Sequence, residues 1–393
     1  MKFSFLKTTP PEHLQLHPNN FDFDWDNWLW QLRSSLKSRT DFEKWFTLTP
    51  EEKIIFSQDK SEFNIRSTPY YSALATDHPE DPIRKILMPH ALEFDDGNQS
   101  LEDPLNEKNN NPTSRIIHRY PDRVLFLITD MCSVYCRYCT RKYFTGHEQN
   151  LLKKDELNNG LKYIKSHPEI REVILSGGDP LTLSTEKLSQ ILFEIRKIDH
   201  VEIIRIGTRM PVVCPMRVDL DLVKELKKYK PVFLMTHFNH PRELSLEAAN
   251  ALELFVDNGI PTFNQMVLLN GVNNHAVIVK ALSRRLLYLR VKPYYMFQCD
   301  PSRGTDHLRT TIEDSEQIQR ELWGKLSGLA LPQLSIDIPN GGGKVGLTPN
   351  FEVSRNESGR SYQGWDQITA EYINPNPKNI LKPIDIDTYS NEI

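Results

Sequence analysis

The sequence predicts an α/β protein in which residues 113–345 form a partial barrel of the (β/α)6 type. Short apolar runs alternate with amphipathic helical patterns over this range, as in a parallel sheet that is covered by helices. Six or seven such units suit a full or partial barrel better than a short open sheet. The apolar runs also end in polar residues, and in barrels these strand ends face the active site. The strand-end residues are Asp130, Asp179, Thr208, His237, Asn270 and Asp300.

Each element of the barrel has its own local signal. The apolar runs predict strands at residues 124–129, 172–178, 201–208, 232–238, 261–269, 292–298 and 333–339. Helical periodicity between them predicts helices at 185–198, 219–229, 245–259 and 275–289. Ser184 and Ser245 are expected to be helix N-caps, because a Ser side chain can accept a hydrogen bond from a free amide of the first turn.

The two ends of the chain differ from the barrel. Residues 1–112 are predicted to be a mainly helical region, in which Trp25, Trp28, Leu29 and Leu32 have the spacing of an amphipathic helix. Residues 346–393 are predicted to be a C-terminal extension. Its last part, residues 374–393, is polar and is expected to be a loosely ordered tail.

Composition excludes several classes of function. A net charge of −4 argues against a general nucleic-acid binder, and no apolar run approaches the roughly 18 residues that cross a bilayer. The N-terminus does not have the pattern of a secretory signal. Five cysteines are an odd count, and three of them are too close together for a disulfide framework, which favours a metal or redox role in a reducing compartment. We therefore expect a cytoplasmic protein.

Three cysteines, Cys132, Cys136 and Cys139, directly follow the first predicted barrel strand with the spacing C-x3-C-x2-C. A structural zinc site would need four ligands, and Cys214 and Cys299 lie in or beside later units. Three thiolates from one loop suit a 4Fe–4S cluster whose fourth iron is open. Such an iron can bind S-adenosylmethionine, and reduction of the sulfonium then gives a carbon radical. A zinc knuckle or buried structural cysteines remain the alternatives.

The segment around these cysteines, "HRYPDRVLFLITDMCSVYCRYCTRK", resembles the radical S-adenosylmethionine superfamily and, within it, the lysine 2,3-aminomutase family. The likeness runs from about residue 25 to about residue 353 through "SGGDPL", "RIGTRMPVV", "THFNHP", "NQMVLLNGVN", "KPYYMFQCD" and "DIPNGGGK". It implies an isomerase that uses a 4Fe–4S cluster, S-adenosylmethionine and pyridoxal 5'-phosphate. In such an enzyme the 5'-deoxyadenosyl radical drives a 2,3-amino shift between L-lysine and L-β-lysine.

The stretch "LSGGDP" ends a predicted strand, and its residues Gly177 and Gly178 would allow a ligand to approach the backbone closely. Asp179 can accept a hydrogen bond from an ammonium group. The resemblance implies that this stretch, with Ser176, binds the amino group of S-adenosylmethionine, and that two further residues lie near that cofactor. These two are His237 and Gln265. A plain strand-end turn and a structural histidine are the alternatives.

The stretch "DIPNGGGKVG" places three glycines before Lys344. They would leave room for a planar ligand, and a lysine amine can form a Schiff base with pyridoxal phosphate. A phosphate-binding loop or an exposed turn is the alternative, although the spacing is not that of a P-loop. The resemblance implies that Lys344 carries pyridoxal phosphate. Arg119 and Arg123 are the cations expected to hold its phosphate group.

The expected substrate follows from charge. The resemblance implies that Arg141 binds the α-carboxylate, and that Asp300 and Asp337 receive the side-chain ammonium of lysine. Two carboxylates around a buried ammonium discriminate against an anionic side chain. The alternative is a structural role, in which Asp300 caps a loop and Asp337 supports the glycine turn. An aminomutase for glutamate or arginine also remains open.

Two other functions also remain open for this chain. The chain could supply β-lysine for the modification of elongation factor P, although Thr140 and the long N-terminal region favour an enzyme that acts on free lysine. The other alternative, from a different class of function, is a non-catalytic iron–sulfur electron carrier. No cysteine follows Cys299, so the structural zinc of well-known lysine mutases is expected to be absent, and Phe297 stands where the family often has tyrosine. Partners are expected to be lysine, a reductant such as flavodoxin or ferredoxin, and further copies of the chain in a homo-oligomer.

Overall fold

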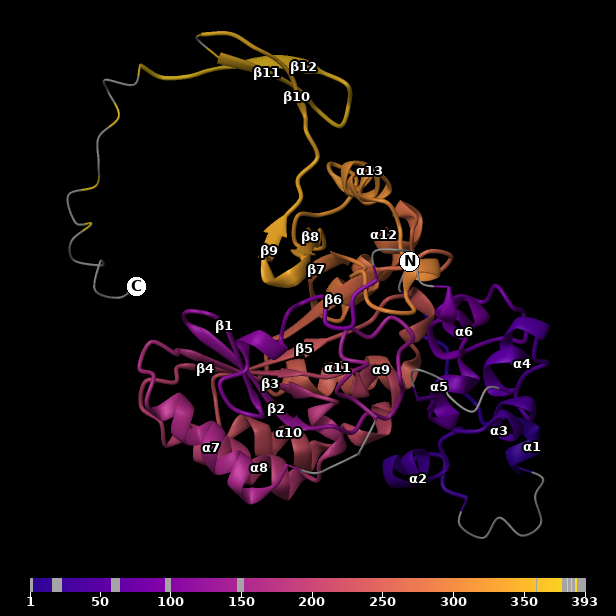
Figure 1. Cartoon of the computed structure of the whole chain (residues 1–393). Helices are drawn as coiled ribbons and strands as arrows, with labels where there is room; N and C mark the ends of the chain where they lie inside the picture. Colours follow the sequence, from indigo (N-terminus) through magenta and orange to yellow (C-terminus); the bar gives the residue numbers. More distant parts are fainter. Residues whose placement is uncertain are drawn as a thin grey trace.

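A nine-stranded sheet forms the centre of the molecule, which we describe from a computed structural model (Figure 1). The structure describes residues 3–15, 23–57, 64–95, 100–146, 152–357 and 359–376, together with residues 380, 383 and 386. Seven neighbouring strands are parallel: β2 (Arg123–Thr129), β3 (Glu172–Gly177), β4 (Ile203–Gly207), β5 (Val232–Thr236), β6 (Thr262–Leu268), β7 (Lys292–Gln298) and β8 (Gln333–Ile338). They match all seven predicted strands.

The sheet curves into a partial barrel and does not close. Its spatial order follows the chain, and its two edges are β1 (Ile116–Tyr120) and β9 (Gly343–Gly346), which pair antiparallel with β2 and β8. The predicted fold class, a partial α/β barrel, is therefore confirmed. The antiparallel edges were not predicted, because "IIHRY" and "GKVG" are short and carry no distinct apolar run.

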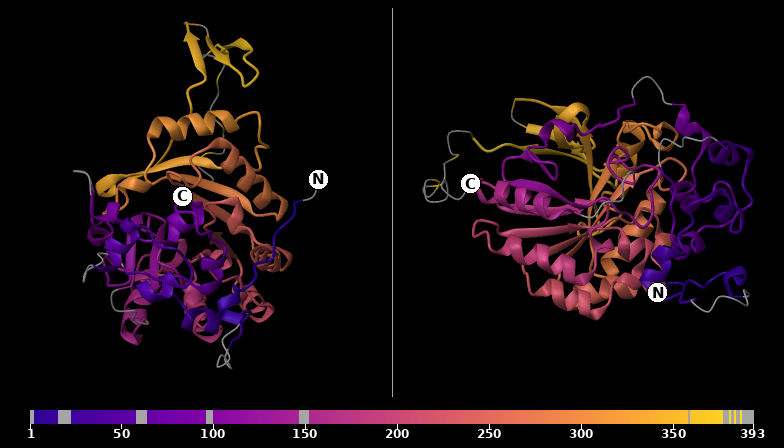
Figure 2. Two further views of the ribbon diagram at one scale, coloured as in Figure 1. Left: turned by 90° about the vertical axis from the view of Figure 1, so that its right-hand side faces the viewer. Right: turned by 60° about the horizontal axis from the view of Figure 1, so that its bottom comes forward.

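Helices follow successive parallel strands and cover the outside of the sheet (Figure 2). They are α7 (Lys154–Lys165), α8 (Thr185–Arg196), α10 (Leu220–Lys227), α11 (Leu246–Asp257), α12 (Ala276–Tyr288) and α13 (Ile312–Leu322). The two predicted N-caps are confirmed, since the Ser184 side chain accepts from the Lys187 amide and the Ser245 side chain accepts from the Ala248 amide. These six connections make the (β/α)6 arrangement.

Alternation along the strands divides the core from the interior of the barrel. On β3, Val173 and Leu175 are fully buried in the hydrophobic core, whereas Ile174 lines a cavity inside the barrel. On β4, Ile204 is likewise in the core, and Arg205 faces the cavity. Because successive side chains of a strand point to opposite faces, one face of the sheet packs on the helices and the other forms a site.

The N-terminal region lies beside the barrel (Figure 1) and consists of short helices, as predicted. They are α1 (Glu12–Gln15), α2 (Trp28–Arg33), α3 (Arg39–Glu43), α4 (Pro50–Ser57), α5 (Pro69–Ala73) and α6 (Pro82–Leu87). The predicted amphipathic helix is shorter than its periodicity suggested, because the Asn27 side chain accepts from the amides of Leu29 and Trp30 and starts α2 there. Trp25 is buried outside that helix, whereas Leu29 is exposed.

The C-terminal extension contains a second sheet that the sequence did not predict. Its strands β10 (Glu352–Arg355), β11 (Gly359–Gln363) and β12 (Thr369–Ile373) are antiparallel, and they stand away from the barrel in Figure 1. Most of their side chains are exposed, so they lack the apolar runs that identify buried strands. Most of the predicted loosely ordered tail, residues 374–393, lies outside the described residues.

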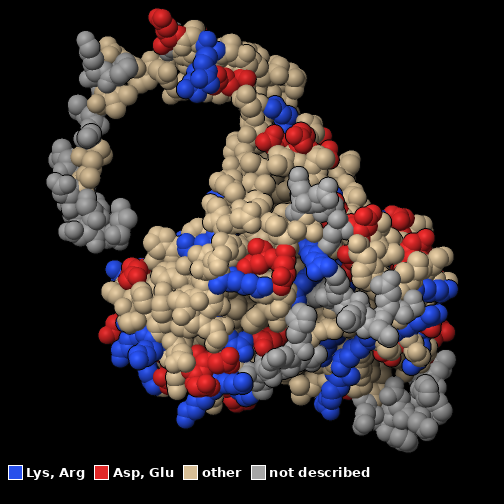
Figure 3. Space-filling model, in the orientation of Figure 1, with Lys and Arg blue, Asp and Glu red and all other residues tan. Residues whose placement is uncertain are grey.

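The remaining elements are one-turn helices in the connections. They are α9 (Met210–Val213), η1 (Ala91–Phe94), η2 (Lys108–Asn110), η3 (Pro180–Thr182), η4 (Pro215–Arg217), η5 (Pro241–Glu243), η6 (Asp306–Leu308) and η7 (Pro339–Gly341). None of the helices in the described residues is long and apolar enough to cross a bilayer. On the face drawn in Figure 3, basic and acidic side chains are interspersed, without a large patch of one sign.

Candidate active site

A cavity of about 580 Å³ lies inside the partial barrel and gathers almost every residue that the sequence singled out. The predicted residues that line it are Cys132, Cys136, Cys139, Arg119, Arg123, Arg141, Ser176, Gly178, Asp179, His237, Gln265, Asp300, Asp337 and Lys344. Gly177 is not among them. The thiol loop and the glycine-flanked lysine therefore face one cavity.

Four of the six strand-end residues line this cavity, namely Asp179, Thr208, His237 and Asp300. The other two lie elsewhere. Asp130 is buried in an ion pair with Arg115, and Asn270 is exposed and donates to the His307 carbonyl. Position at the end of a strand was thus a useful signal that did not by itself decide which side chains reach the cavity.

The cysteine loop is held in place from the N-terminal region. The Tyr135 amide donates to the Arg66 carbonyl at 3.0 Å, and the Arg137 amide donates to the Ile86 carbonyl at 3.1 Å. The Arg137 side chain forms a buried ion pair with Glu93. A buried charge pair with good geometry is costly to disrupt, so it anchors the loop. The N-terminal helices, whose role the sequence left open, therefore position the three thiols.

The three thiols fit an iron–sulfur cluster better than a single metal ion. Among the described residues, no three His, Cys, Asp or Glu side chains are grouped as one ion would require. A 4Fe–4S cluster binds each cysteine through a different iron, so its thiolates do not converge. Burial and the neighbouring thiols raise the pKa values of Cys132 and Cys139. Both thiols therefore need a bound cation to ionise near neutral pH.

The two glycines of "SGGDP" admit protein backbone. A Cβ on Gly177 would lie 2.3 Å from the Thr129 carbonyl oxygen, and one on Gly178 would lie 2.1 Å from the Met131 carbonyl oxygen. The Gly178 amide donates to the Thr129 carbonyl at 2.6 Å. The start of the cysteine loop passes close to both glycines, and Gly178 also lines the cavity, so its predicted approach to a ligand stays a prediction. The two glycines lock the loop against β3.

Asp179 organises the ends of β3 and β4. Its Oδ1 accepts from the Leu181 amide and the Thr208 hydroxyl at 3.0 and 2.6 Å, and its Oδ2 accepts from the Arg209 amide at 2.7 Å. Burial raises the pKa of this carboxyl group. The predicted contact with the amino group of S-adenosylmethionine stays a prediction, and Asp179 also has a clear structural role.

His237 offers a free polar atom to the cavity. Its Nε2 is buried without a hydrogen-bond partner in the described part of the chain, and its ring stacks on Tyr138 with a centroid distance of 5.5 Å. Burial, together with the charge of Arg209, lowers its pKa to about 3, so the imidazole is neutral. A buried unpaired nitrogen of this kind fits a polar ligand. Gln265 lines the same cavity from β6.

Lys344 lies on β9 directly opposite Asp337 on β8. Its Nζ is 4.0 Å from Asp337 Oδ2, and it lies 4.8 and 4.4 Å from the ring centroids of Tyr295 and Phe297. Burial lowers the pKa of the Lys344 amine, Asp337 opposes this, and Arg123 adds to it. A larger neutral fraction makes the amine a better nucleophile.

The glycines before Lys344 shape a turn as well as open space. Gly341 and Gly343 have φ values of +95° and +86°, and Asn340 between β8 and the turn has a φ of +62°. Positive φ favours glycine, so these residues allow β9 to fold back on β8. The hairpin brings the lysine to face its aspartate.

Three arginines line the cavity near the lysine, and each also has a carboxylate partner. Arg119 lies 4.0 Å from Asp337 through Nη1, and its Nε and Nη2 are buried without hydrogen-bond partners in the described residues. Arg123 pairs with Asp122 at 2.7 Å and lies over the Tyr120 ring. Arg205, which the sequence analysis missed, also faces the cavity from β4. Its signal was a charged residue inside an apolar run. Such a set suits an anionic group such as a phosphate.

Arg141 already holds a carboxylate in this structure. Its Nε donates to Glu107 Oε2 at 3.0 Å and its Nη2 donates to Glu107 Oε1 at 2.7 Å. The Tyr143 hydroxyl donates to the same carboxylate at 2.7 Å, and Arg141 Nη1 donates to Ser176 Oγ at 3.2 Å. Glu107 was missed because it lies in a polar segment without periodicity. Glu107 thus already pairs with the guanidinium, and the predicted contact of Arg141 with a substrate carboxylate stays a prediction.

Comparison with known proteins agrees with this geometry. Residues 126–279 match the family model described as "Radical SAM superfamily", and residues 319–393 match that described as "Lysine-2,3-aminomutase". The chain is 43% identical over 355 residues to the L-lysine 2,3-aminomutase of Clostridium subterminale, which covers 90% of this chain and 85% of that protein. The chain belongs to the lysine 2,3-aminomutase family.

Other members of the family define the range of activities. The L-lysine 2,3-aminomutase of Bacillus subtilis is 40% identical over 93% of this chain and 77% of its own length. The glutamate 2,3-aminomutase of Clostridioides difficile is 38% identical over 88% of this chain and 82% of its own length. The chain is therefore a radical S-adenosylmethionine aminomutase, an isomerase, and similarity alone leaves its amino acid open.

Membership in the radical SAM superfamily implies a 4Fe–4S cluster and S-adenosylmethionine. The donor set fits both, since three thiols leave one iron of a cluster open and the unpaired His237 Nε2 lies in the same cavity. In this family member the cysteine loop would hold the cluster through Cys132, Cys136 and Cys139.

Proposed function

We propose that this chain interconverts L-lysine and L-β-lysine with pyridoxal 5'-phosphate on Lys344, in addition to the cluster and S-adenosylmethionine. The observation that carries the proposal is the placement of Asp300 and Asp337 beside Lys344, in the same cavity as the three thiols. When bound, the cluster and S-adenosylmethionine supply a radical that can take a hydrogen from an unactivated carbon, and pyridoxal phosphate supplies a π-bonded nitrogen.

The residues around Lys344 support pyridoxal phosphate. The amine has a lowered pKa because of burial, and it lies against the rings of Tyr295 and Phe297, which suit a flat aromatic partner. Arg119 has two buried guanidinium nitrogens without partners, which would bind and orient the phosphate group. Arg123 and Arg205, which also line the cavity, would add further positive charge.

The charges of the cavity support lysine over glutamate. Arg141 would bind the α-carboxylate, and Asp300 and Asp337 would bind a distal ammonium. A glutamate side chain in the same place would put a third carboxylate beside two half-buried ones, which is unfavourable. The similarity to a glutamate 2,3-aminomutase leaves glutamate as the alternative substrate.

Amino-acid analysis after anaerobic incubation tests the proposal directly. The full chain would be reconstituted with iron, sulfide, S-adenosylmethionine and pyridoxal phosphate, reduced, and incubated separately with lysine, glutamate and arginine. We expect free β-lysine from lysine and no β-amino acid from the other two. Conversion of glutamate or arginine but not lysine would refute the substrate assignment. A cluster without any turnover would favour an electron carrier.

Lys344→Ala should abolish β-lysine formation and remove the pyridoxal absorption band, because the amine that holds the cofactor is gone. The cluster absorption should stay, since no thiol is changed. Lys187→Ala on the outer face of α8 is the matched control and should keep both bands and full turnover. Retained turnover in Lys344→Ala would contradict the assignment of the lysine.

The remaining partners are part of the same proposal. One electron per activation has to come from outside the chain, for which a flavodoxin or a ferredoxin is a suitable donor. β-Lysine that appears only on elongation factor P, with no free product, would point instead to the alternative role in modification of that protein.

A further inference from the structure

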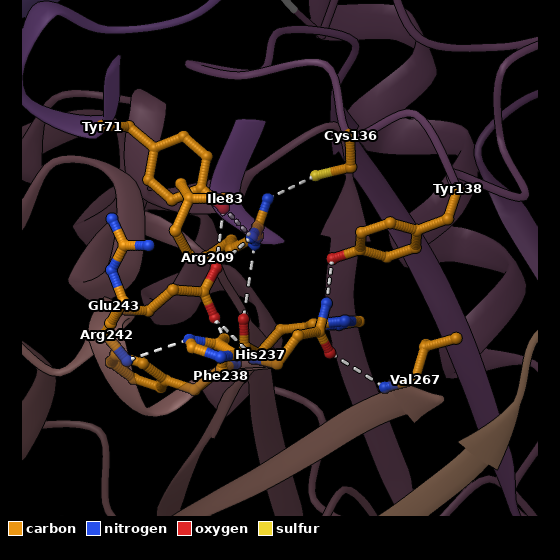
Figure 4. Close-up of polar contacts among 12 residues, drawn as sticks. Tyr71, Ile83, Cys136, Tyr138, Arg209, His237, Phe238, Arg242, Glu243 and Val267 are labelled. Carbon is orange, nitrogen blue, oxygen red and sulfur yellow. Dashed lines mark hydrogen bonds and ion pairs between the residues drawn. The ribbon is translucent and has the colours of Figure 1, made fainter. Parts of the chain in front are cut away.

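A buried arginine that the sequence analysis did not select contacts a cysteine of the cluster loop. Arg209 follows β4 and is only 9% exposed. Its Nη1 donates to Cys136 Sγ at 2.8 Å, and its Nε donates to the His237 carbonyl at 3.3 Å. Figure 4 shows the guanidinium group lying between the sulfur and a buried carboxylate. The positive charge is therefore next to a sulfur that would bind iron.

Buried hydrogen bonds with Glu243 and Tyr71 hold the guanidinium group of Arg209 in place. Arg209 Nη2 donates to Glu243 Oε1 at 2.6 Å and to the Tyr71 hydroxyl at 2.7 Å, and Tyr71 also donates to Glu243 Oε1 at 2.7 Å (Figure 4). The other carboxylate oxygen, Oε2, accepts from the Asn239 and His240 amides at 2.6 and 2.9 Å. Glu243 and Tyr71 are both completely buried. These contacts aim Arg209 at the sulfur.

We propose that Arg209, held by Glu243 and Tyr71, donates a hydrogen bond to the Cys136 thiolate of the bound cluster and raises the reduction potential of that cluster. One electron from an external donor takes the cluster from the oxidised to the reduced state and adds one negative charge. A hydrogen bond and a positive charge at a ligating sulfur stabilise the more negative state, and hydrogen bonds to sulfur are a known control of cluster potential.

Glu243 has an opposite electrostatic effect in this scheme. It orients Arg209, but its negative charge also offsets part of the positive charge near the sulfur. Removal of the arginine charge should therefore make the cluster harder to reduce, and removal of the glutamate charge alone should make it easier to reduce. An arginine that only joins the N-terminal region to the barrel would give no such opposite pair of effects.

The test is a redox titration of the full chain with a reconstituted cluster, followed by the electron paramagnetic resonance signal of the reduced cluster. No amino acid, pyridoxal phosphate or S-adenosylmethionine is added, so the result does not depend on the proposed substrate. Arg209→Gln should move the midpoint potential downward, by about 59 mV if the reduction equilibrium changes tenfold in a one-electron couple. Glu243→Gln should move it upward.

A matched control separates this effect from the general loss of a buried ion pair. Arg84 is also fully buried, and it pairs with Glu52 at 2.6 Å and with Asp77 in the N-terminal region. Arg84→Gln should leave the midpoint potential unchanged. Equal potentials in wild type and Arg209→Gln, or shifts of the two test variants in the same direction, would overturn the proposal.

If iron analysis shows that Arg209→Gln does not assemble a cluster, Arg209→Lys and Glu243→Gln together test the proposal. Arg209→Lys keeps the positive charge, so the midpoint potential of its cluster should be equal to or slightly below that of wild type. Glu243→Gln keeps Arg209, so the midpoint potential of its cluster should be higher than that of wild type. A potential of Glu243→Gln at or below that of wild type would then count against the proposal, whatever the turnover of the enzyme.

Discussion

At the scale of single residues, the two aspartates of the cavity differ in their surroundings. Asp337 faces Lys344 across a hairpin and lies 4.0 Å from both Lys344 and Arg119. Burial and the charge of Asp337 raise the pKa of Asp300 to about 7. Asp300 is thus the carboxylate whose charge state changes near neutral pH, and a distal ammonium would stabilise its ionised form.

Asp300→Asn should reduce kcat/KM for lysine at least tenfold, because a neutral amide pairs poorly with a buried ammonium; tenfold corresponds to about 1.4 kcal/mol. Steady-state kinetics would measure the effect. Asp306→Asn, at an exposed position nearby in the chain, is the matched control and should behave as wild type. Unchanged kinetics in Asp300→Asn would remove the reason for naming lysine.

The raised pKa of Asp300 also predicts a pH dependence. Below about pH 7 the free enzyme holds Asp300 protonated, and above it the group is ionised and can pair with an ammonium. We therefore expect kcat/KM for lysine to rise as pH increases from 6 to 8 and then to level off, since this parameter reports groups of the free enzyme. The rise should disappear in Asp300→Asn. A profile that falls over this range would contradict the prediction.

At the scale of elements, backbone contacts between β3 and the cysteine loop set the geometry of the cluster site. The Gly178 amide reaches the Thr129 carbonyl, and the Asp179 amide reaches the Met131 carbonyl at 2.7 Å. From the other side, Glu93 and Arg137 tie the same loop to the N-terminal region. Protein contacts thus fix the loop at two sides.

Gly178→Ala should weaken cluster binding and lower stability by about 1–3 kcal/mol, because its Cβ would lie 2.1 Å from the backbone oxygen of Met131. Iron content after reconstitution and thermal unfolding would measure the two effects. Gly328→Ala meets no atom within 4 Å and is the control that should keep both at the wild-type level. Full iron loading in Gly178→Ala would show that the loop tolerates displacement.

At the scale of the whole molecule, the C-terminal sheet is the part least supported by the rest of the chain (Figure 1). Its exposed apolar side chains include Trp365, Ile368, Tyr372 and Ile373, and β12 has an unpaired edge among the described strands. Exposed apolar clusters and open edges favour association with another chain. We therefore expect this sheet to take part in the contacts of the predicted homo-oligomer.

Sedimentation velocity tests that expectation. The wild-type chain should sediment as a dimer or larger assembly, and the double variant Tyr372→Ser and Ile373→Ser should shift toward monomer, because apolar contact area is lost. Phe193→Ser, at an exposed apolar position on α8, is the control and should not change the assembly. A wild-type chain that is monomeric at all concentrations would refute the homo-oligomer.

Local signals in the sequence predicted a large part of the fold and of the candidate site. Apolar periodicity depends only on neighbours along the chain, so it predicted all seven parallel strands and four of the six helices between them; α7 and α13 were not predicted. The cysteine spacing and the glycine-flanked Lys344 were visible for the same reason. The sheet of β10–β12 was not, because its strands bury little and therefore carry no apolar pattern.

Contacts between distant parts of the chain were decided only by the tertiary structure. Arg209 and Cys136 are 73 residues apart, and Arg141 and Glu107 are 34 apart. Gly178 lines the cavity as predicted for a ligand contact, and its close approach to the backbone of the cysteine loop became visible only in the structure. Periodicity indicates which face of an element a residue occupies, but the partner it meets there depends on how separate elements pack, and no local pattern encodes that.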